Sequence, residues 1–180
     1  MLGVFKKMAG TKKDRDVKAL RPAVARINEL EQAYQSLSPG QLKAKTDEFR
    51  ARLANGEAVD DLMCEAFAAV KNACRRLKDE QRTFDVCGHE TTWHEVPWDS
   101  QLMAGIVLHQ GKIAELATGE GKTLAATMPL YLNSLTGNAH LVTTNDYLAR
   151  RDAHWMSQVY EYLGVTVGCI QNDMSPFERR

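Results

Sequence analysis

The spacing of apolar residues predicts helices through the first 80 positions, because these residues recur every three or four places, as on one face of an α-helix. The first such stripe consists of Val17, Leu20, Val24, Ile27, Leu30, Tyr34 and Leu37. Pro22 is expected to start or kink that helix. A Ser-Pro-Gly-Gln sequence at 38–41 predicts the capped start of a second helix, which Asn-Gly at 55–56 ends. A third helix is expected over about 59–77, so residues 1–80 should form an all-helical N-terminal segment.

The pattern changes in the second half of the chain. Residues 81–100 have no clear periodicity and are expected to form an irregular insertion. Strands are then predicted at 112–116, 140–144 and 165–170, and helices at 122–134 and about 146–162. Because strands alternate with helices at this spacing, the sequence predicts an α/β fold with a parallel sheet and right-handed crossovers.

Charge and cysteine content narrow the classes of function. The chain has 23 basic and 23 acidic residues, so no global field favours nucleic acid or an acidic substrate. The four cysteines form no CxxC pair, which favours reduced intracellular thiols over a disulfide framework. Residues 1–26 are locally cationic, with apolar Leu2, Phe5 and Met8 among the first positions. This segment could bind anionic lipid headgroups or could be a solvated terminus.

The strongest chemical signal is a glycine-containing loop, Thr118-Gly119-Glu120-Gly121-Lys122-Thr123, between a predicted strand and a predicted helix. The glycines let backbone N–H groups point at phosphate oxygens, and the helix start adds its positive dipole end. Lys122 would reach the β- and γ-phosphates, and the Thr123 hydroxyl would be a ligand of Mg²⁺. The alternative is a chance glycine turn. Leu116 stands where the general pattern has glycine, which favours helicase-like motors.

Two further regions carry candidate residues. Gln101 offers the donor and acceptor that adenine requires, although an ordinary surface glutamine is the alternative. Asn145 or Asp146 is expected to cap the helix that follows the second predicted strand. Asp146 or Arg150 could couple the site to the rest of the sheet, or could simply lie on a solvated helix face.

A metal site within the irregular insertion is a weaker hypothesis. Cys87, His89 and His94 are candidate ligands, but no fourth ligand follows at regular spacing. The alternative is a surface loop pinned by Trp93 and Trp98.

Several stretches resemble the SecA family, the ATP-driven motors of bacterial preprotein translocation. They are GKIAELATGEGKTLAAT, LTGNAHLVTTNDYLARRDAHWM, LSPGQLKAKTDEFRARLANGE and EAFAAVKNACRRL, and the resemblance covers nearly the whole chain. It implies a P-loop NTPase fold of the RecA-like, helicase type, with residues 101–180 as the first part of the first nucleotide-binding, DEAD-like motor domain. It also implies ATP and Mg²⁺ as cofactors. Gln101 would read adenine, and Gly119 to Thr123 would hold the phosphates, with Lys122 and Thr123 as catalytic residues.

The same resemblance implies partners and a location. The partners would be a SecYEG-type protein-conducting channel, unfolded preproteins and an anionic membrane surface bound by the N-terminus, with no nucleic acid. A homodimer is compatible with the family. The protein would be cytoplasmic and associated peripherally with the inner face of the plasma membrane.

The sequence also departs from a complete motor. No Asp-Glu pair follows a hydrophobic strand after the phosphate loop, and the second motor domain with its arginine finger is missing. The chain is therefore expected to be an N-terminal fragment that is inactive alone. Two alternatives remain: a nucleic-acid helicase or other remodelling ATPase with the same core, and a non-catalytic helical adaptor that binds a membrane or partner through residues 1–77.

Overall fold

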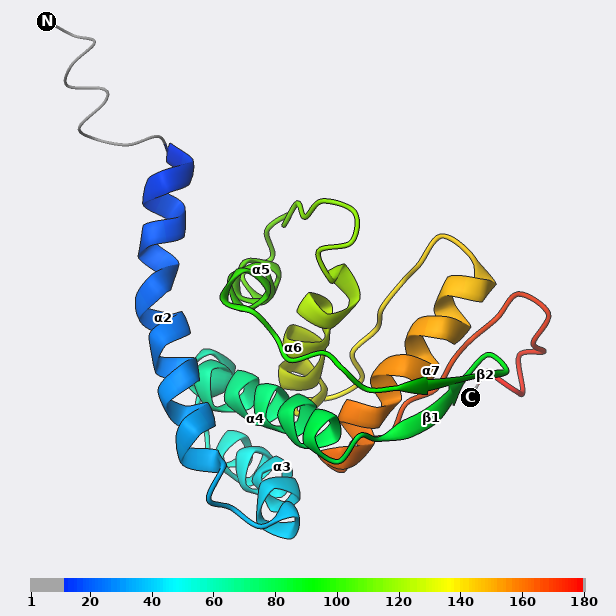
Figure 1. Ribbon diagram of the computed structural model, residues 1–180, viewed down its shortest axis with the longest axis horizontal. Helices are drawn as coiled ribbons and strands as arrows, with labels where there is room; N and C mark the ends of the chain where they lie inside the picture. The colour runs from blue at the N-terminus through cyan, green and yellow to red at the C-terminus, as the bar shows by residue number, and fades with distance from the viewer. Residues whose placement is uncertain (1–11, 180) are drawn as a thin grey trace, which may run out of the picture.

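The computed structural model describes residues 12–179. Its elements are α2 (Lys12–Tyr34), α3 (Pro39–Ala54), α4 (Val59–Asp79), β1 (Thr83–Val86), β2 (His89–Thr92), α5 (Asp99–His109), α6 (Lys122–Ser134) and α7 (Asp146–Tyr162). Figure 1 shows α2 standing along one side of the molecule, with α3 beside its C-terminal end. The lipid contact expected of the N-terminus depends mainly on residues 1–11, which lie outside the described residues.

The helices of the first half follow the predicted pattern closely. The Ser38 side chain accepts a hydrogen bond from the Gln41 backbone, and the Gln41 side chain accepts one from the Ser38 backbone, so the capping box of α3 is confirmed. Helix α3 ends at the predicted place, and Gly56 adopts a φ of +94° beyond it. Helix α2 begins at Lys12 and contains Pro22, so the expectation that Pro22 starts the helix is wrong.

Helix α4 is the centre of the core because it packs against α2, α3, α6 and α7. Its middle is buried nearly all round, and small residues such as Ala66, Ala69 and Ala73 let neighbouring helices approach closely. Buried Thr46 on α3 connects this helix to α6 and α7 by hydrogen bonds. Its hydroxyl bonds the Tyr131 hydroxyl at 2.7 Å and donates to the Leu163 carbonyl at the end of α7. The helical first half therefore fixes where α6 and α7 lie.

Helix α5 was not predicted, and it packs against α6 at a close crossing. A Cβ atom at Gly105 would lie 3.1 Å from both the Ala125 carbonyl oxygen and a ring carbon of Phe67. Only glycine therefore fits here without movement of a neighbour. In Figure 1 the connection from α5 to α6 arches away from the helices, and this connection carries the phosphate loop.

Residues 81–100 are not irregular throughout, as the sequence suggested, because they contain an antiparallel hairpin in which Thr83 pairs with Thr92 and Val86 with His89. Cys87 and Gly88 form its two-residue turn with φ angles of 54° and 87°. Such turns usually carry Asn-Gly or Asp-Gly, so cysteine at the first position hid the signal. The hairpin lies along α7 (Figure 1).

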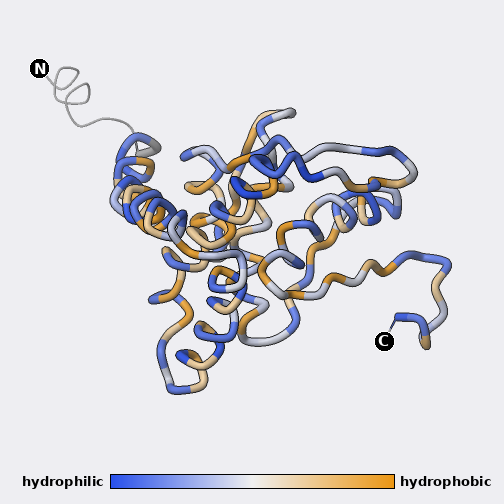
Figure 2. The backbone as a smooth tube through the Cα atoms, turned by 60° about the horizontal axis from the view of Figure 1, so that its bottom comes forward, coloured by the Kyte–Doolittle hydropathy of each residue, from blue (hydrophilic) through white to orange (hydrophobic). Residues whose placement is uncertain are grey.

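The predicted parallel sheet is not confirmed. Within the described residues the three segments expected to be strands, 112–116, 140–144 and 165–170, are neither helix nor strand and form no ladder. Ile113 is 95% exposed and Val142 is 88% exposed, so their apolar side chains have no covering layer. Apolar stretches of the last segment run outside the helical body in Figure 2. The observed fold is mainly helical with one small antiparallel sheet.

The physical reason is that a parallel strand obtains its hydrogen bonds only from a strand beside it. Segments 140–144 and 165–170 instead line an apolar cavity of about 240 Å³ together with α6 and α7.

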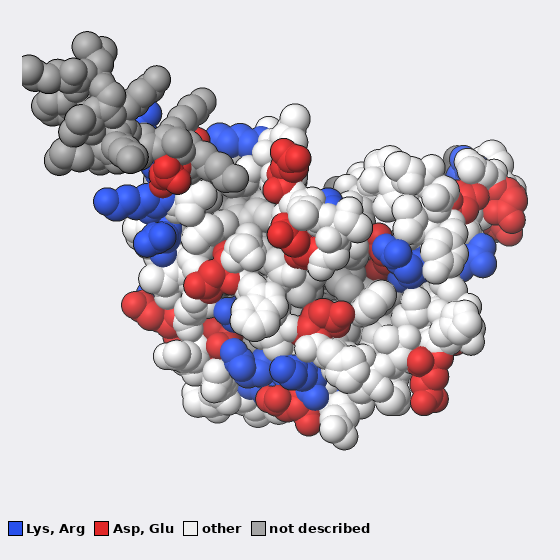
Figure 3. Space-filling view, turned by 45° about the horizontal axis from the view of Figure 1, so that its top comes forward, with Lys and Arg blue, Asp and Glu red and all other residues white. Residues whose placement is uncertain are grey.

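Figure 3 shows acidic and basic side chains interspersed on the visible face, with no broad region of one sign. No helix in residues 12–179 combines the length and apolar character needed to span a bilayer.

Candidate functional site

The phosphate loop, defined here as Thr118–Thr123, is a compact turn held by its own hydrogen bonds. The Glu120 carboxylate accepts from the Ala117 backbone N–H at 2.9 Å, and the Lys122 Nζ donates to the Ala117 carbonyl at 2.9 Å. Gly119 and Gly121 have φ angles of 89° and 76°, a region that disfavours residues with a Cβ. The two glycines therefore permit the curled path that the sequence predicted.

The phosphate loop leads directly into α6, and no side chain caps the start of that helix. Gly121 occupies the N-cap position in the left-handed conformation and makes no side-chain cap. The first N–H groups of a helix have no partner within the helix, and the helix dipole favours an anion there. Lys122 is the first helical residue and is exposed. The start of α6 therefore combines free amide donors with one ammonium group, which suits a phosphate.

Gln101 lies directly against this loop. Its Nε2 donates to the Glu120 carbonyl at 2.9 Å, and its Oε1 accepts from the Trp98 backbone N–H at 2.9 Å. The side chain is buried, so the alternative of an ordinary surface glutamine is wrong. A Cβ atom at Gly121 would overlap the Gln101 Nε2 atom. Helix α5 and the start of α6 thus meet at these two residues.

A cavity of about 400 Å³, called here the base cavity, opens beside Gln101. It is lined by Lys71, Arg75, Lys78, His94, Glu95, Val96, Pro97, Trp98, Gln101 and Leu124. Trp98 is 76% exposed, so the expectation that it pins the preceding loop is wrong. Trp98 instead lines the cavity with its side chain accessible to solvent. The lining combines basic side chains with an amide, an aromatic ring and a few aliphatic groups, so it offers both polar contacts and a surface for stacking to a planar heterocycle.

The sequence did not identify the basic wall of this cavity. Lys71, Arg75 and Lys78 are spaced by four and three residues, so they lie on one face of α4. The spacing alone could have predicted a basic face on this helix, but it does not show that the face lies toward Gln101. Lys71 is buried, and burial is the main reason its pKa is lowered.

Thr123 does not line the base cavity. It lines the apolar cavity between α6 and α7, and its carbonyl accepts from the Thr127 hydroxyl at 3.0 Å. Residues 12–179 hold no cluster of three or more His, Cys, Asp or Glu side chains that could bind a metal by itself.

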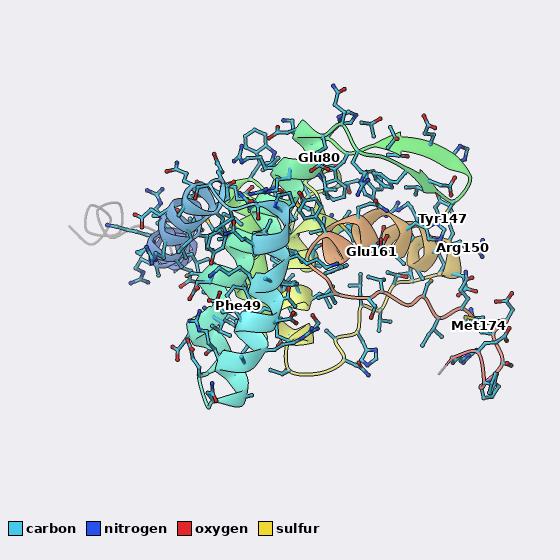
Figure 4. All side chains as sticks on the ribbon, turned by 90° about the horizontal axis from the view of Figure 1, so that it is seen from below. Phe49, Glu80, Tyr147, Arg150, Glu161 and Met174 are labelled. Carbon is cyan, nitrogen blue, oxygen red and sulfur yellow. The ribbon has the colours of Figure 1, made fainter. Side chains whose placement is uncertain are left out.

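The start of α7 is capped as expected, by Asn145, whose side chain accepts from the Leu148 backbone at 2.8 Å. Asp146 accepts from the Asn172 backbone, and Arg150 donates to Gln171 at 3.0 Å. Figure 4 shows Arg150 near this end of α7 and Glu161 toward the other. Asp146 and Arg150 thus hold the C-terminal segment against α7. Their side-chain hydrogen bonds in the described residues go to that segment and not to the phosphate loop.

The metal hypothesis for the insertion is not supported. Cys87, His89 and His94 do not form a ligand cluster in the part of the chain that the structure describes. The Cys87 backbone N–H instead donates to the His154 ring, which fastens the hairpin turn to α7. Trp93 is fully buried and packs near Phe84, so the expectation that Trp93 anchors this region is confirmed.

Comparison with known proteins decides the family. The model of the SecA DEAD-like domain matches residues 5–180. The chain belongs to the SecA DEAD-like domain family. Proteins named protein translocase subunit SecA from Francisella philomiragia and Thermosynechococcus vestitus are 50% identical over 181 residues and 52% identical over 178 residues. These alignments cover 100% and 98% of this chain.

The SecA relatives are much longer than this chain. It spans 18% of the length of each of the two relatives above, and 17% of a Synechococcus relative that is 50% identical over 181 residues. The helicase-type assignment of the sequence analysis is therefore confirmed at the level of the family, while its parallel sheet is not.

Proposed function

We propose that this chain supplies the nucleotide-binding part of an ATP-driven motor that moves preproteins across a membrane. The observation that carries the proposal is the meeting of Gln101 with the phosphate loop at the uncapped start of α6. It occurs in a chain that is half identical, along its whole length, to proteins named translocase subunits. The similarity to these relatives and the local chemistry of the site therefore both favour ATP as the ligand.

Each residue of the site would have a separate role. The phosphates would bind the backbone amides of Gly119 to Thr123, with the Lys122 ammonium leaving the Ala117 carbonyl to contact them. The Thr123 hydroxyl would hold Mg²⁺, which neutralises phosphate charge. The adenine would occupy the base cavity against Gln101, whose amide keeps a second N–H and a second lone pair after its two observed bonds.

Hydrolysis and transport would belong to the longer parent protein. The acidic pair that positions water, the second motor domain, the protein-conducting channel and the preprotein clients are all proposed there, by resemblance to the family. We also propose that strands outside these 180 residues fill the apolar cavity between α6 and α7, where segments 140–144 and 165–170 lack partners. Contact of the N-terminus with an anionic membrane remains part of this proposal.

Calorimetric titration of the 180-residue chain with MgATP tests the site. We expect weak binding that Lys122→Ala abolishes, because the loop loses its only ammonium group. Lys112→Ala is the matched control, since Lys112 precedes the loop and contacts Gln110 instead. Equal affinity of wild type and Lys122→Ala would remove the assigned role. Phosphate release by the chain alone should stay far below that of an intact motor, and a comparable rate would place the hydrolytic machinery within these residues.

A further inference from the structure

Asn28 on α2 joins two helices that border the candidate site. Its Oδ1 accepts from the Lys71 Nζ of α4 at 2.7 Å, and its Nδ2 donates to the Asp99 Oδ1 of α5 at 3.0 Å. The amide orientation follows from chemistry, because an ammonium group can only donate and a carboxylate can only accept. We call these three side chains the Asn28 bridge. It connects positions 43 and 71 residues away from Asn28 along the chain.

The two ends of the Asn28 bridge lie on helices that carry residues of the proposed nucleotide site. Lys71 lines the base cavity, and its buried position means that it needs a close oxygen acceptor. Asp99 opens α5 just ahead of Gln101, in the same helical turn. Gln101 in turn holds the Glu120 carbonyl of the phosphate loop. A continuous chain of contacts therefore runs from α2 to the loop.

The next turn of α2 strengthens the same connection. Glu31 is buried and accepts from the Arg75 guanidinium at 2.7 Å and from the Asn72 side chain at 3.1 Å. Arg75 lines the base cavity beside Lys71. Helix α2 thus holds two of the basic side chains along one wall of that cavity. If α2 moved away, both cations would lose their partners and would be free to turn into the space proposed for adenine.

We propose that α2 positions the nucleotide site, with Asn28 as the positioning residue that holds Gln101 against the phosphate loop. Displacement of α2 from α4 and α5 then lowers nucleotide affinity at a site that α2 does not touch directly. The inference rests on the proposed function. It adds a route by which whatever binds the N-terminal helix alters nucleotide binding.

A charge swap across the Asn28 bridge tests the inference. Asn28→Asp keeps the acceptor for Lys71 but sets two carboxylates against each other, so MgATP affinity should fall about tenfold, the effect of one hydrogen bond to a charged group. Adding Asp99→Asn restores the hydrogen bond with its direction reversed, because the amide at position 99 now donates to the carboxylate at position 28. Affinity should then return to within about twofold of wild type. Arg26→Ala is the control, because Arg26 lies on α2 but pairs only with exposed Glu29 in the described structure. Failure of the swap to restore affinity would contradict the inference.

A second measurement separates positioning from a general loss of stability. In a Gln101→Ala background, Asn28→Asp should cause no further loss of affinity, because its effect passes through Gln101. Additive losses would overturn the proposal. The NMR signals of the Gln101 side-chain amide should also shift in Asn28→Asp without nucleotide, and unchanged signals would count against it.

The outcomes distinguish this inference from the proposed function. If wild type binds MgATP, Lys122→Ala does not, and Asn28→Asp equals wild type, only the inference fails. If neither wild type nor Lys122→Ala binds, the proposed function of this chain fails and takes the inference with it.

Discussion

Gly121 and Gln101 show how single residues shape the candidate site. Gly121 has a positive φ at the start of α6, and a side chain there would collide with the Gln101 amide. Gly119 has a similar backbone angle but nothing within 4 Å of a Cβ atom. A side chain at Gly119 would therefore cause backbone strain alone, whereas a side chain at Gly121 would cause both strain and a collision.

Gly121→Ala should weaken MgATP binding more than Gly119→Ala does. Both variants force a residue with a Cβ into the left-handed region, at a cost of about 1–2 kcal/mol. Only Gly121→Ala also pushes the Gln101 amide away from the Glu120 carbonyl. Calorimetric affinities of the two variants check this order. Equal losses would indicate that Gln101 has no part in holding the loop.

Sequence reasoning found the loop residues because their signal is local. The Gly-x-Gly-Lys-Thr core needs only neighbouring residues to form its turn, and its conformation is as expected. The base cavity is formed instead by residues from α4, from the segment 94–98 and from the starts of α5 and α6, which are far apart along the chain. Its basic wall at Lys71 and Arg75 was therefore missed, as was the contact of Asn28 with Asp99.

At the scale of elements, helices were predictable and strands were not. Helices α6 and α7 have the expected bounds, because their hydrogen bonds lie within each segment. The segments around Ile113, Val142 and Val167 have suitable composition but no neighbouring strand in the described residues. Helix α5 was missed because its apolar residues show no single stripe, and it is buried between other elements.

The pairing of α2 with α4 should depend on pH through Glu31. Burial alone would raise the Glu31 pKa, but hydrogen bonds and charge from Arg75, with Asn72 and Gln35, outweigh it and lower the pKa below 4.5. The stabilisation is therefore complete above about pH 4.5 and is lost as the pH falls through the lowered value. Glu31→Gln should reduce the free energy of unfolding by about 1–3 kcal/mol near pH 7.

Urea denaturation at a series of pH values measures this effect. The difference between wild type and Glu31→Gln should shrink as the pH falls below about 4.5, because the wild-type carboxylate then becomes protonated. Glu29→Gln is the control, since Glu29 is exposed on the same helix. A Glu31→Gln difference that stays constant down to pH 3 would contradict the assignment.

At the scale of the whole molecule, the helices form a packed body, while the segments predicted to be parallel strands form no sheet within residues 12–179. The core around α4 buries its apolar residues, whereas Ile113 and Val142 remain exposed. The chain spans 18% of the length of the relatives it matches. The resemblance of the sequence therefore identified the family correctly, whereas strand propensity did not describe the structure of these residues.

The interspersed surface charge also bears on the alternatives. A helicase that tracks single strands would be expected to have a continuous basic groove, and the face in Figure 3 shows both signs together. The basic side chains that do converge, on α4, surround a cavity beside Gln101. That placement favours a nucleotide site over a nucleic-acid path.

The central claim is that a triphosphate binds at the start of α6, and a crystal structure of this chain with MgATP or a non-hydrolysable analogue tests it most directly. We expect phosphate oxygens at the amides of Gly119 to Thr123, the Lys122 Nζ turned from the Ala117 carbonyl to the phosphates, and the base in the cavity beside Gln101. Nucleotide bound elsewhere, with Lys122 still on Ala117, would contradict the account.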